Sequence, residues 1–246
     1  MWDDDRDDDL GHDQAGGDGG EHCVATSRYV PSSSPHARQR LQEQVYYLHC
    51  RDRQDAEDET RLLFTATDTG TSRADARALL WANRSVKSVC FHRLILSPST
   101  GLGITTTEEA QAWTRTVMEE LGRRLDRELT WVGSVHRNTG RPHVHVLVAG
   151  EAAQPSTGGA GRVVRFGRDD IKALRTRLTI DAARPIREAA QARERALARV
   201  EQEARRVALY ERLGVRLTPS ATPAQAVPLA PPSQAARKRH WWQRGP

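Results

Sequence analysis

The sequence predicts an α+β fold in which a central antiparallel β-sheet is flanked by helices. Residues 89–96 and 143–148 are short runs rich in β-branched and apolar side chains, which is typical of strands. The five residues 137–141 can form a turn that joins two such runs into an antiparallel hairpin. Strand and helix patterns alternate irregularly along the chain rather than as repeated βαβ units, which favours an antiparallel sheet.

The remaining elements follow from periodicity and capping signals. Ala37, Leu41, Val45 and Leu48 recur at helical spacing within residues 36–50. A capping-box pair, Thr106 and Glu109, predicts a helix that buries residues 110, 113, 117, 121 and 125. The other expected elements are strands at 62–64, 129–135 and 162–166, a helix from Thr71 or Ser72 to 82 with Ala74, Ala78 and Leu79 inward, a helix from Asp169 or Asp170 to about 183 that Pro185 breaks, and a long charged helix to about 213.

Composition divides the chain into a body and two tails. Residues 1–35 are rich in Asp, Gly and Ser and are expected to be a disordered acidic tail. Residues 36–190 are expected to form the folded domain, and residues 191–214 an extended charged helix. Residues 215–246, which are rich in Pro and Ala before a basic end, are expected to be a disordered basic tail.

The charge of the body indicates a nucleic-acid partner. Residues 1–21 carry a net charge of −8 while the whole chain carries +5, so residues 22–246 carry +13, almost all of it from arginine. The sequence shows no membrane-length apolar run and no secretion signal, so we expect a cytoplasmic protein without membrane contact. Cys23, Cys50 and Cys90 are too few and too widely spaced for a disulfide framework or a zinc ribbon, and we interpret them as buried or idle thiols.

Three histidines form a candidate metal site. His143 and His145 are two residues apart on a predicted strand, so they point to the same face, about 7 Å apart. Val144, Val146 and Val148 then point to the opposite face, into a core. The hairpin can bring His136 beside the pair. Three neutral imidazoles leave coordination positions open on a metal ion, which can then act as a Lewis acid on a phosphate oxygen.

Residues 135–148 (Val-His-Arg-Asn-Thr-Gly-Arg-Pro-His-Val-His-Val-Leu-Val) resemble the HUH motif region of conjugative relaxases, the mobilization nucleases. Residues 91–98 resemble the preceding strand of that family, and residues 44–51 resemble its N-terminal helix with the nucleophilic tyrosine. Residues 169–175 resemble the helix after the last core strand. The resemblance covers roughly residues 36–190.

This resemblance implies site-specific nicking of single-stranded DNA at a transfer origin, through a 5′-phosphotyrosine intermediate that allows the strand to be rejoined. It implies a divalent metal on the three histidines, Mg²⁺ or Mn²⁺ with Zn²⁺ as a third candidate. Tyr47 is the first candidate nucleophile, with Tyr46 as its alternative. Accessory DNA-binding proteins and coupling proteins are the expected partners. The expected DNA contacts are Arg51, His92, Arg137, Arg141 and Arg175, with packing in the sheet as the other reading of His92.

The chain departs from the family pattern at two places. Many relatives place an acidic residue near the histidines, but no acid lies between His136 and His143, so Asp68, Asp126 and Glu128 are the candidate substitutes. After Tyr47 and Leu48, His49-Cys50 stand where one small residue is usual. Two other functions stay open, namely a rolling-circle initiator or transposase of the HUH class that uses Tyr210, and a non-catalytic DNA-binding accessory protein.

Overall fold

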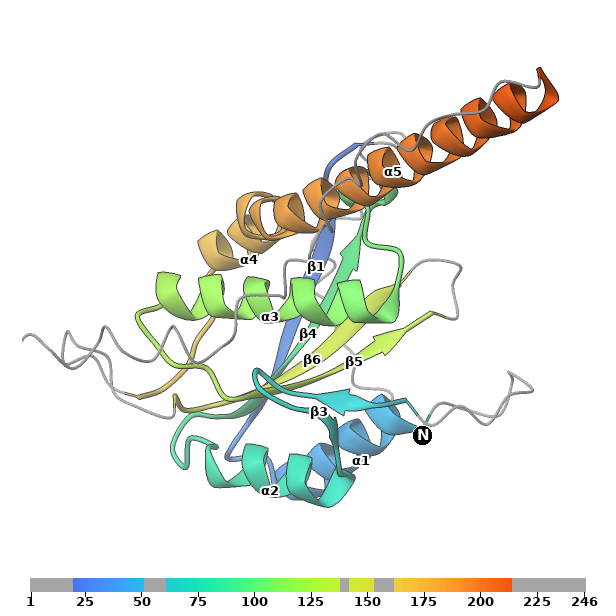
Figure 1. The fold of residues 1–246 in the computed structure, drawn as a ribbon. Helices are drawn as coiled ribbons and strands as arrows, with labels where there is room; N and C mark the ends of the chain where they lie inside the picture. Colours follow the sequence, from blue (N-terminus) through green and yellow to red (C-terminus); the bar gives the residue numbers. More distant parts are fainter. Residues whose placement is uncertain (1–19, 51–60, 138–141, 153–161, 214–246) are drawn as a thin grey trace, which may run out of the picture. The chain divides into compact units, whose positions relative to one another are not determined.

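The chain is α+β with one six-stranded antiparallel sheet, in the order β1-β4-β6-β5-β2-β3 (Figure 1). The computed structural model describes residues 20–50, 61–137, 142–152 and 162–213, which belong to two compact units, 1–193 and 194–246. The elements are β1 (Cys23–Pro31), α1 (Ala37–His49), β2 (Leu63–Phe64), β3 (Thr69–Thr71), α2 (Arg73–Ala82), β4 (Val89–Pro98), η1 (Thr100–Leu102), α3 (Thr107–Arg124), β5 (Trp131–His136), β6 (His143–Ala149), α4 (Arg168–Arg175) and α5 (Arg177–Arg212). The expected fold class is therefore confirmed at this level.

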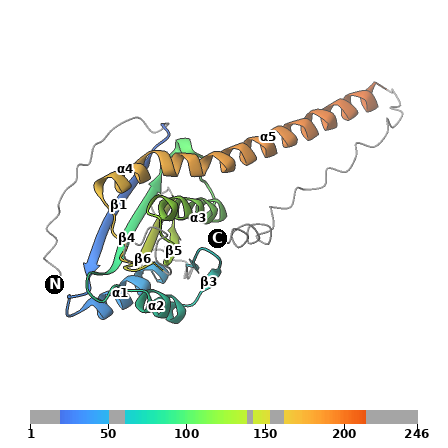
Figure 2. The ribbon, with the colours of Figure 1, turned by 90° about the vertical axis from the view of Figure 1, so that its left-hand side faces the viewer.

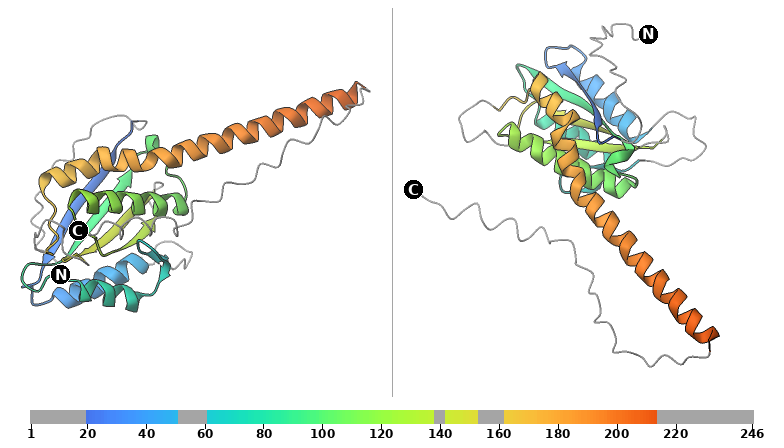
Figure 3. Two further views of the ribbon diagram at one scale, coloured as in Figure 1. Left: turned by 60° about the vertical axis from the view of Figure 1, so that its left-hand side comes forward. Right: turned by 90° about the horizontal axis from the view of Figure 1, so that it is seen from above.

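In the first unit, helices cover both faces of the sheet. Helices α3 and α4 lie over one face, and α1 and α2 lie over the other, as the views in Figures 2 and 3 also show. Each face has its own apolar core, with Trp113 of α3 buried in the first and Leu41 of α1 buried in the second. The sheet is thus the middle of three layers, and residues that alternate along a strand enter different cores.

The valines of β6 lie in the core under α3, as the alternation predicts. Val144, Val146 and Val148 are fully buried there, while Leu147 and Ala149 are buried under α1 and α2. The odd-numbered positions of β6 therefore face the same side of the sheet as α1, and this places His143 and His145 on that side.

Helices α1 and α3 form as their sequences predict. All four expected apolar residues of α1 are buried, and its core-facing stripe packs against the sheet. In α3, the Thr106 hydroxyl accepts from the Glu109 N–H at 3.1 Å, and the Glu109 carboxylate accepts from the Thr106 N–H at 3.0 Å. Two of the four N–H groups that a helix start leaves unpaired are thereby satisfied.

The prediction that residues 1–35 form a disordered tail is wrong for its second part. Strand β1 pairs with β4 along its length, from Cys23 opposite Pro98 to Pro31 opposite Val89. Cys23 and Ala25 are buried while Val24 is exposed, so the strand does alternate, but with small side chains that give a weak hydrophobic signal. The domain boundary expected at residue 36 is wrong for the same reason. Residues 1–19 lie outside the described residues.

The inward face expected for α2 and the strand expected at residues 162–166 are also wrong. Helix α2 begins after Ser72 as predicted, but it buries Ala76 and Leu80 rather than Ala74, Ala78 and Leu79. The face that packs against the rest of the domain is therefore rotated about the helix axis relative to the predicted face. Among the described residues of 162–166 there is no strand. Residues 162–166 contribute one isolated β-bridge, between Val163 and Glu151. Strand β6 ends at Ala149, before this bridge, so the pairing does not extend into a strand.

The break between the last two helices lies at Thr176, not at Pro185. Helix α4 begins after Gly167, whose N–H donates to the Asp170 carboxylate at 2.9 Å, and ends at Arg175. Pro185 lies inside α5. A proline removes one intrahelical hydrogen bond, but the strong helix formers Ala and Arg on both sides continue the helix. The charged helix therefore begins at Arg177, earlier than the expected residue 191, and residues 214–246 lie outside the described residues.

Among the helices that the structure describes, none combines the length and the apolar character that a membrane span requires.

Gly133 on β5 allows a close approach by the ring of Phe64 on β2. A Cβ at this position would lie 2.8 Å from Phe64 Cζ. We expect Gly133→Ala to lower the free energy of unfolding by about 1–3 kcal/mol, because the buried ring has to move. Urea denaturation measures this loss. In a Phe64→Leu background the same substitution should cost clearly less, and equal costs in the two backgrounds would contradict the packing described.

Candidate metal centre

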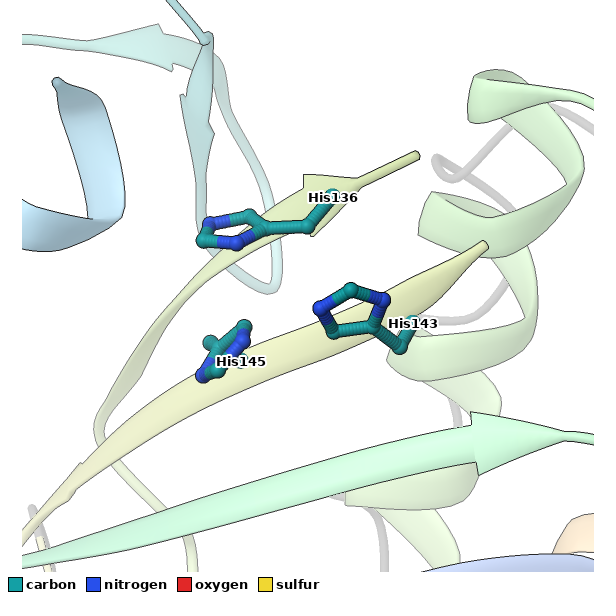
Figure 4. A group of neighbouring side chains, drawn as sticks. All are labelled: His136, His143 and His145. Carbon is teal, nitrogen blue, oxygen red and sulfur yellow. The ribbon is translucent and has the colours of Figure 1, made fainter. Parts of the chain in front are cut away.

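The three predicted histidines lie together at one end of the β5–β6 hairpin. His136 pairs directly with His143, and Ser134 pairs with His145. The ring centroid of His136 lies 4.3 Å from that of His145 and 5.4 Å from that of His143. Figure 4 shows the three side chains. One nitrogen of each ring lies within 4.8 Å of those of the other two, so the three side chains could hold a metal ion.

Burial and charge keep His136 neutral. Its side chain is only 1% exposed, and its pKa is lowered to about 2, first by burial and then by His145, Arg61 and His143. A neutral imidazole has a lone pair for a metal, whereas an imidazolium does not. The donor set therefore fits a divalent ion, and it fits one that accepts nitrogen ligands best.

The backbone of Leu48, in the last turn of α1, tends to raise the pKa of His136, against the larger effect of burial. Histidines that bind metals usually donate their second ring N–H to a carboxylate, a carbonyl or a water molecule, which selects the tautomer. Among the described residues, the group able to share one ion consists of the three histidines alone. Asp68, Asp126 and Glu128 are exposed and lie outside this group, so they are not among the residues that could share the ion with the histidines.

Helix α1 places Tyr47 against the histidines. The ring centroid of Tyr47 lies 5.6 Å from that of His136 and 5.4 Å from that of His145. Tyr46 is turned about 100° around the helix, and the Arg73 guanidinium lies over its ring at 5.6 Å. Tyr47 is 41% exposed, so solvent and a ligand can reach it. Of the two candidate nucleophiles, the structure brings Tyr47 to the metal centre.

Arg61 belongs to the centre although no sequence signal pointed to it. Its Nη1 atom lies 3.5 Å from both ring nitrogens of His136. His49, which the sequence showed only as a departure from the family pattern, holds the Arg61 backbone. Arg61 is separated from its contacts by 12 and 75 residues, so spacing along the chain could not reveal it.

Two of the expected DNA contacts, His92 and Arg175, make hydrogen bonds within the fold. His92 is 4% exposed, and its Nε2 atom lies 3.0 Å from the Val164 carbonyl oxygen. It points to the α3 side of the sheet, away from the histidine centre, because it shares that side with Leu94. Arg175 donates from Nε to the Ala25 carbonyl at 3.0 Å and so ties α4 to β1.

The other expected DNA contacts lie near the hairpin or outside the described part of the chain. Arg137 directly follows His136 and is exposed. Arg51 and Arg141 lie outside the described residues. Tyr210 lies on α5 in the second compact unit, and the two units are described separately.

No protein-family model matches this chain, and no curated protein matches it. The resemblance to relaxases therefore rests on the motif residues themselves.

The three thiols are free, and two of them are buried. Burial raises the pKa of Cys23 to about 12 and also raises that of Cys90, so neither forms thiolate at neutral pH. We expect iodoacetamide at pH 8 to label only Cys50 in the native protein, and all three thiols in urea. Mass spectrometry distinguishes these results, and native labelling of Cys23 would contradict the burial of β1.

The centre predicts metal binding that depends on all three rings. We expect Mn²⁺ or Zn²⁺ at about 100 times its dissociation constant to stabilise the fold by about 2.7 kcal/mol. His143→Ala should remove this stabilisation, because one of three ligands is lost while the two buried histidines remain. Calorimetric titration and thermal melting measure it, with His22→Ala, at a half-buried histidine outside the cluster, as the control. An unchanged metal affinity in His143→Ala would exclude the site.

Proposed function

We propose that this protein is a metal-dependent enzyme of the HUH relaxase type, which nicks single-stranded DNA and rejoins it. The observation that carries the proposal is the contact of Tyr47 with His136 and His145. A nucleophile from α1 and a possible metal site from β5 and β6 lie against each other. The contact arises from the packing of α1 on the sheet, because neither the helix nor the two strands could create it alone.

The chemistry is an exchange of phosphodiester bonds. The Tyr47 hydroxyl oxygen attacks phosphorus, and its proton passes to solvent, which reaches this partly exposed residue. The bond from phosphorus to the 3′ oxygen breaks, and that oxygen takes up a proton to give a free 3′-OH. The other end of the strand is then a 5′-phosphotyrosine. Because one ester replaces another, the reverse attack by a 3′-OH can reseal the strand.

The pairing of β5 with β6 holds His136 beside the two histidines of β6. A divalent ion held by them, Mn²⁺ or Mg²⁺ with Zn²⁺ as a third candidate, would supply positive charge to a non-bridging phosphate oxygen. Burial excludes water from His136 and strengthens its interactions with a neighbouring charge.

The charge of the chain supports a nucleic-acid substrate. Residues 22–246 carry +13, mostly as arginine, whose planar fork matches phosphate. A transfer origin in single-stranded form is the proposed substrate, with accessory DNA-binding and coupling proteins as partners in the cytoplasm. Mobilization of a plasmid or an integrated element is the proposed process.

Tyr47→Phe tests the proposal with the least disturbance, because it removes one hydroxyl and keeps the ring. We expect the wild type, with Mn²⁺ or Mg²⁺ and a pool of origin-like single-stranded oligonucleotides, to form a covalent protein–DNA band. EDTA and Tyr47→Phe should each abolish the band. Tyr46→Phe and Tyr210→Phe are the matched controls and should retain it.

The outcomes separate the competing functions. Loss of the band only in Tyr210→Phe would overturn the relaxase mechanism in favour of a rolling-circle initiator or transposase. Salt-sensitive DNA binding without any band, with every metal and oligonucleotide tried, would favour a non-catalytic DNA-binding protein.

A further inference from the structure

Helices α1 and α2 carry two stripes of side chains that face each other along the line where the helices meet. The two helices pack side by side on the face of the sheet that bears the histidines (Figure 1). Residues four apart on a helix are neighbours on one side of it. Each stripe has three such residues: Arg38, Gln42 and Tyr46 on α1, and Arg73, Arg77 and Trp81 on α2. We call this line the α1–α2 seam.

Each end of the seam has an arginine beside an aromatic ring, because the two stripes run in opposite directions. The Arg73 guanidinium lies over the Tyr46 ring, 5.6 Å from its centroid. At the other end, the Arg38 guanidinium lies over the Trp81 ring, also 5.6 Å from the centroid. A cation over the face of an aromatic ring is attracted to it, so these contacts keep positive charge and rings together along the seam.

A groove of about 660 Å³ lies at the Tyr46 end of the seam. Arg73 and Arg77 line it against one acid, Glu43, whose carboxylate accepts a hydrogen bond from Gln39 Nε2 at 2.9 Å. Tyr46 also lines the groove and is 57% exposed, so a ligand in the groove can reach its ring. The groove therefore combines an accessible ring with an excess of positive charge.

This combination fits single-stranded nucleic acid. An accessible aromatic ring can stack on an unpaired base of any kind, and arginines beside the ring can contact the neighbouring phosphates. Over their whole length, α1 and α2 carry four arginines against two acids. Val45, the largest aliphatic residue of the lining, is fully buried, so the groove offers little apolar surface to a protein apart from the Tyr46 ring.

The groove begins next to the candidate nucleophile. Tyr46 directly precedes Tyr47, whose ring lies 5.6 Å from that of His136. The two tyrosine side chains diverge by about 100° around the helix, so one faces the histidines while the other faces the groove. A DNA strand whose phosphate is held at Tyr47 can therefore place a neighbouring base on Tyr46.

We propose that the α1–α2 seam binds the single-stranded DNA that flanks the phosphate at Tyr47. Tyr46 stacks on a base, and Arg73 and Arg77 contact phosphates. This deepens the proposed function and rests on it for the identity of the ligand, single-stranded DNA. Tyr46 then has a role of its own in binding, separate from the chemistry at Tyr47.

The first test measures DNA binding without cleavage. Fluorescein-labelled oligothymidylate is titrated with the full-length protein in EDTA, and anisotropy reports the dissociation constant. We expect Tyr46→Leu to weaken binding roughly fivefold to a hundredfold, as loss of one stacking platform does. Tyr46→Phe and Tyr46→Trp should bind like the wild type, because each keeps an aromatic face. Tyr29→Leu, at a 63% exposed tyrosine of β1, is the matched control and should leave the affinity unchanged.

The second test concerns the two arginines and uses the dependence of binding on salt. Each contact between an arginine and a phosphate of a single strand adds about 0.7 to the slope of log affinity against log salt concentration. Arg73→Gln and Arg77→Gln should each lower the slope by about this amount. Arg168→Gln is the control, because Arg168 is an exposed first residue of α4 as Arg73 is of α2. It should leave the slope unchanged.

Equal affinity of wild type and Tyr46→Leu would overturn the inference, even if the covalent DNA band forms, and would favour a protein as the occupant of the groove. Equal losses for single-stranded and duplex DNA in Tyr46→Leu would also overturn it, because the bases of a duplex are not free to stack on the ring. Binding that depends on Tyr46 and both arginines, without a covalent band in any condition, would retain the seam and reject the nicking function.

Discussion

The pairing of β5 with β6 sets His136 opposite His143, and Ser134 opposite His145. A slip of one residue would turn the two histidines of β6 into the apolar core under α3, and the valines toward the face that α1 and α2 cover. Burial of Val144, Val146 and Val148 opposes such a slip, because polar imidazole rings would take the places of these valines in an apolar core. The same core that stabilises the sheet therefore also keeps the histidines together.

Three consecutive residues at the end of α1 then complete the centre. Tyr47 contributes its ring, Leu48 a backbone that tends to raise the pKa of His136, and His49 its contact with the Arg61 backbone. They can serve different partners because successive helical positions diverge by about 100°, and because backbone and side chain are used separately. The buried side chain of Leu48 anchors this turn in the core under α1, so packing of the helix and geometry of the site depend on one residue.

Much of the fold could be predicted where local patterns are strong. The capping box of α3, the buried stripe of α1 and the valine alternation of β6 are properties of short segments, and the structure has all three. Strand β1 was missed because its inward residues, Cys23 and Ala25, are small. The expected role of Pro185 was wrong because one lost hydrogen bond does not outweigh the helix formers around it.

Of the candidate site, the sequence by itself determined the three histidines. Side chains two residues apart on a strand point to the same face, and a hairpin brings the end of the first strand beside the start of the second. It also favoured two neighbouring tyrosines of one helix as candidate nucleophiles, with Tyr210 kept as the alternative for another HUH function. Only the tertiary structure decided which tyrosine faces the histidines and that Arg61 lies beside His136. These choices depend on how α1 docks on the sheet, and docking is set by contacts between residues far apart in the chain. His92 illustrates the same limit. Nearby residues predict its strand, but they do not predict which face of the sheet α3 covers.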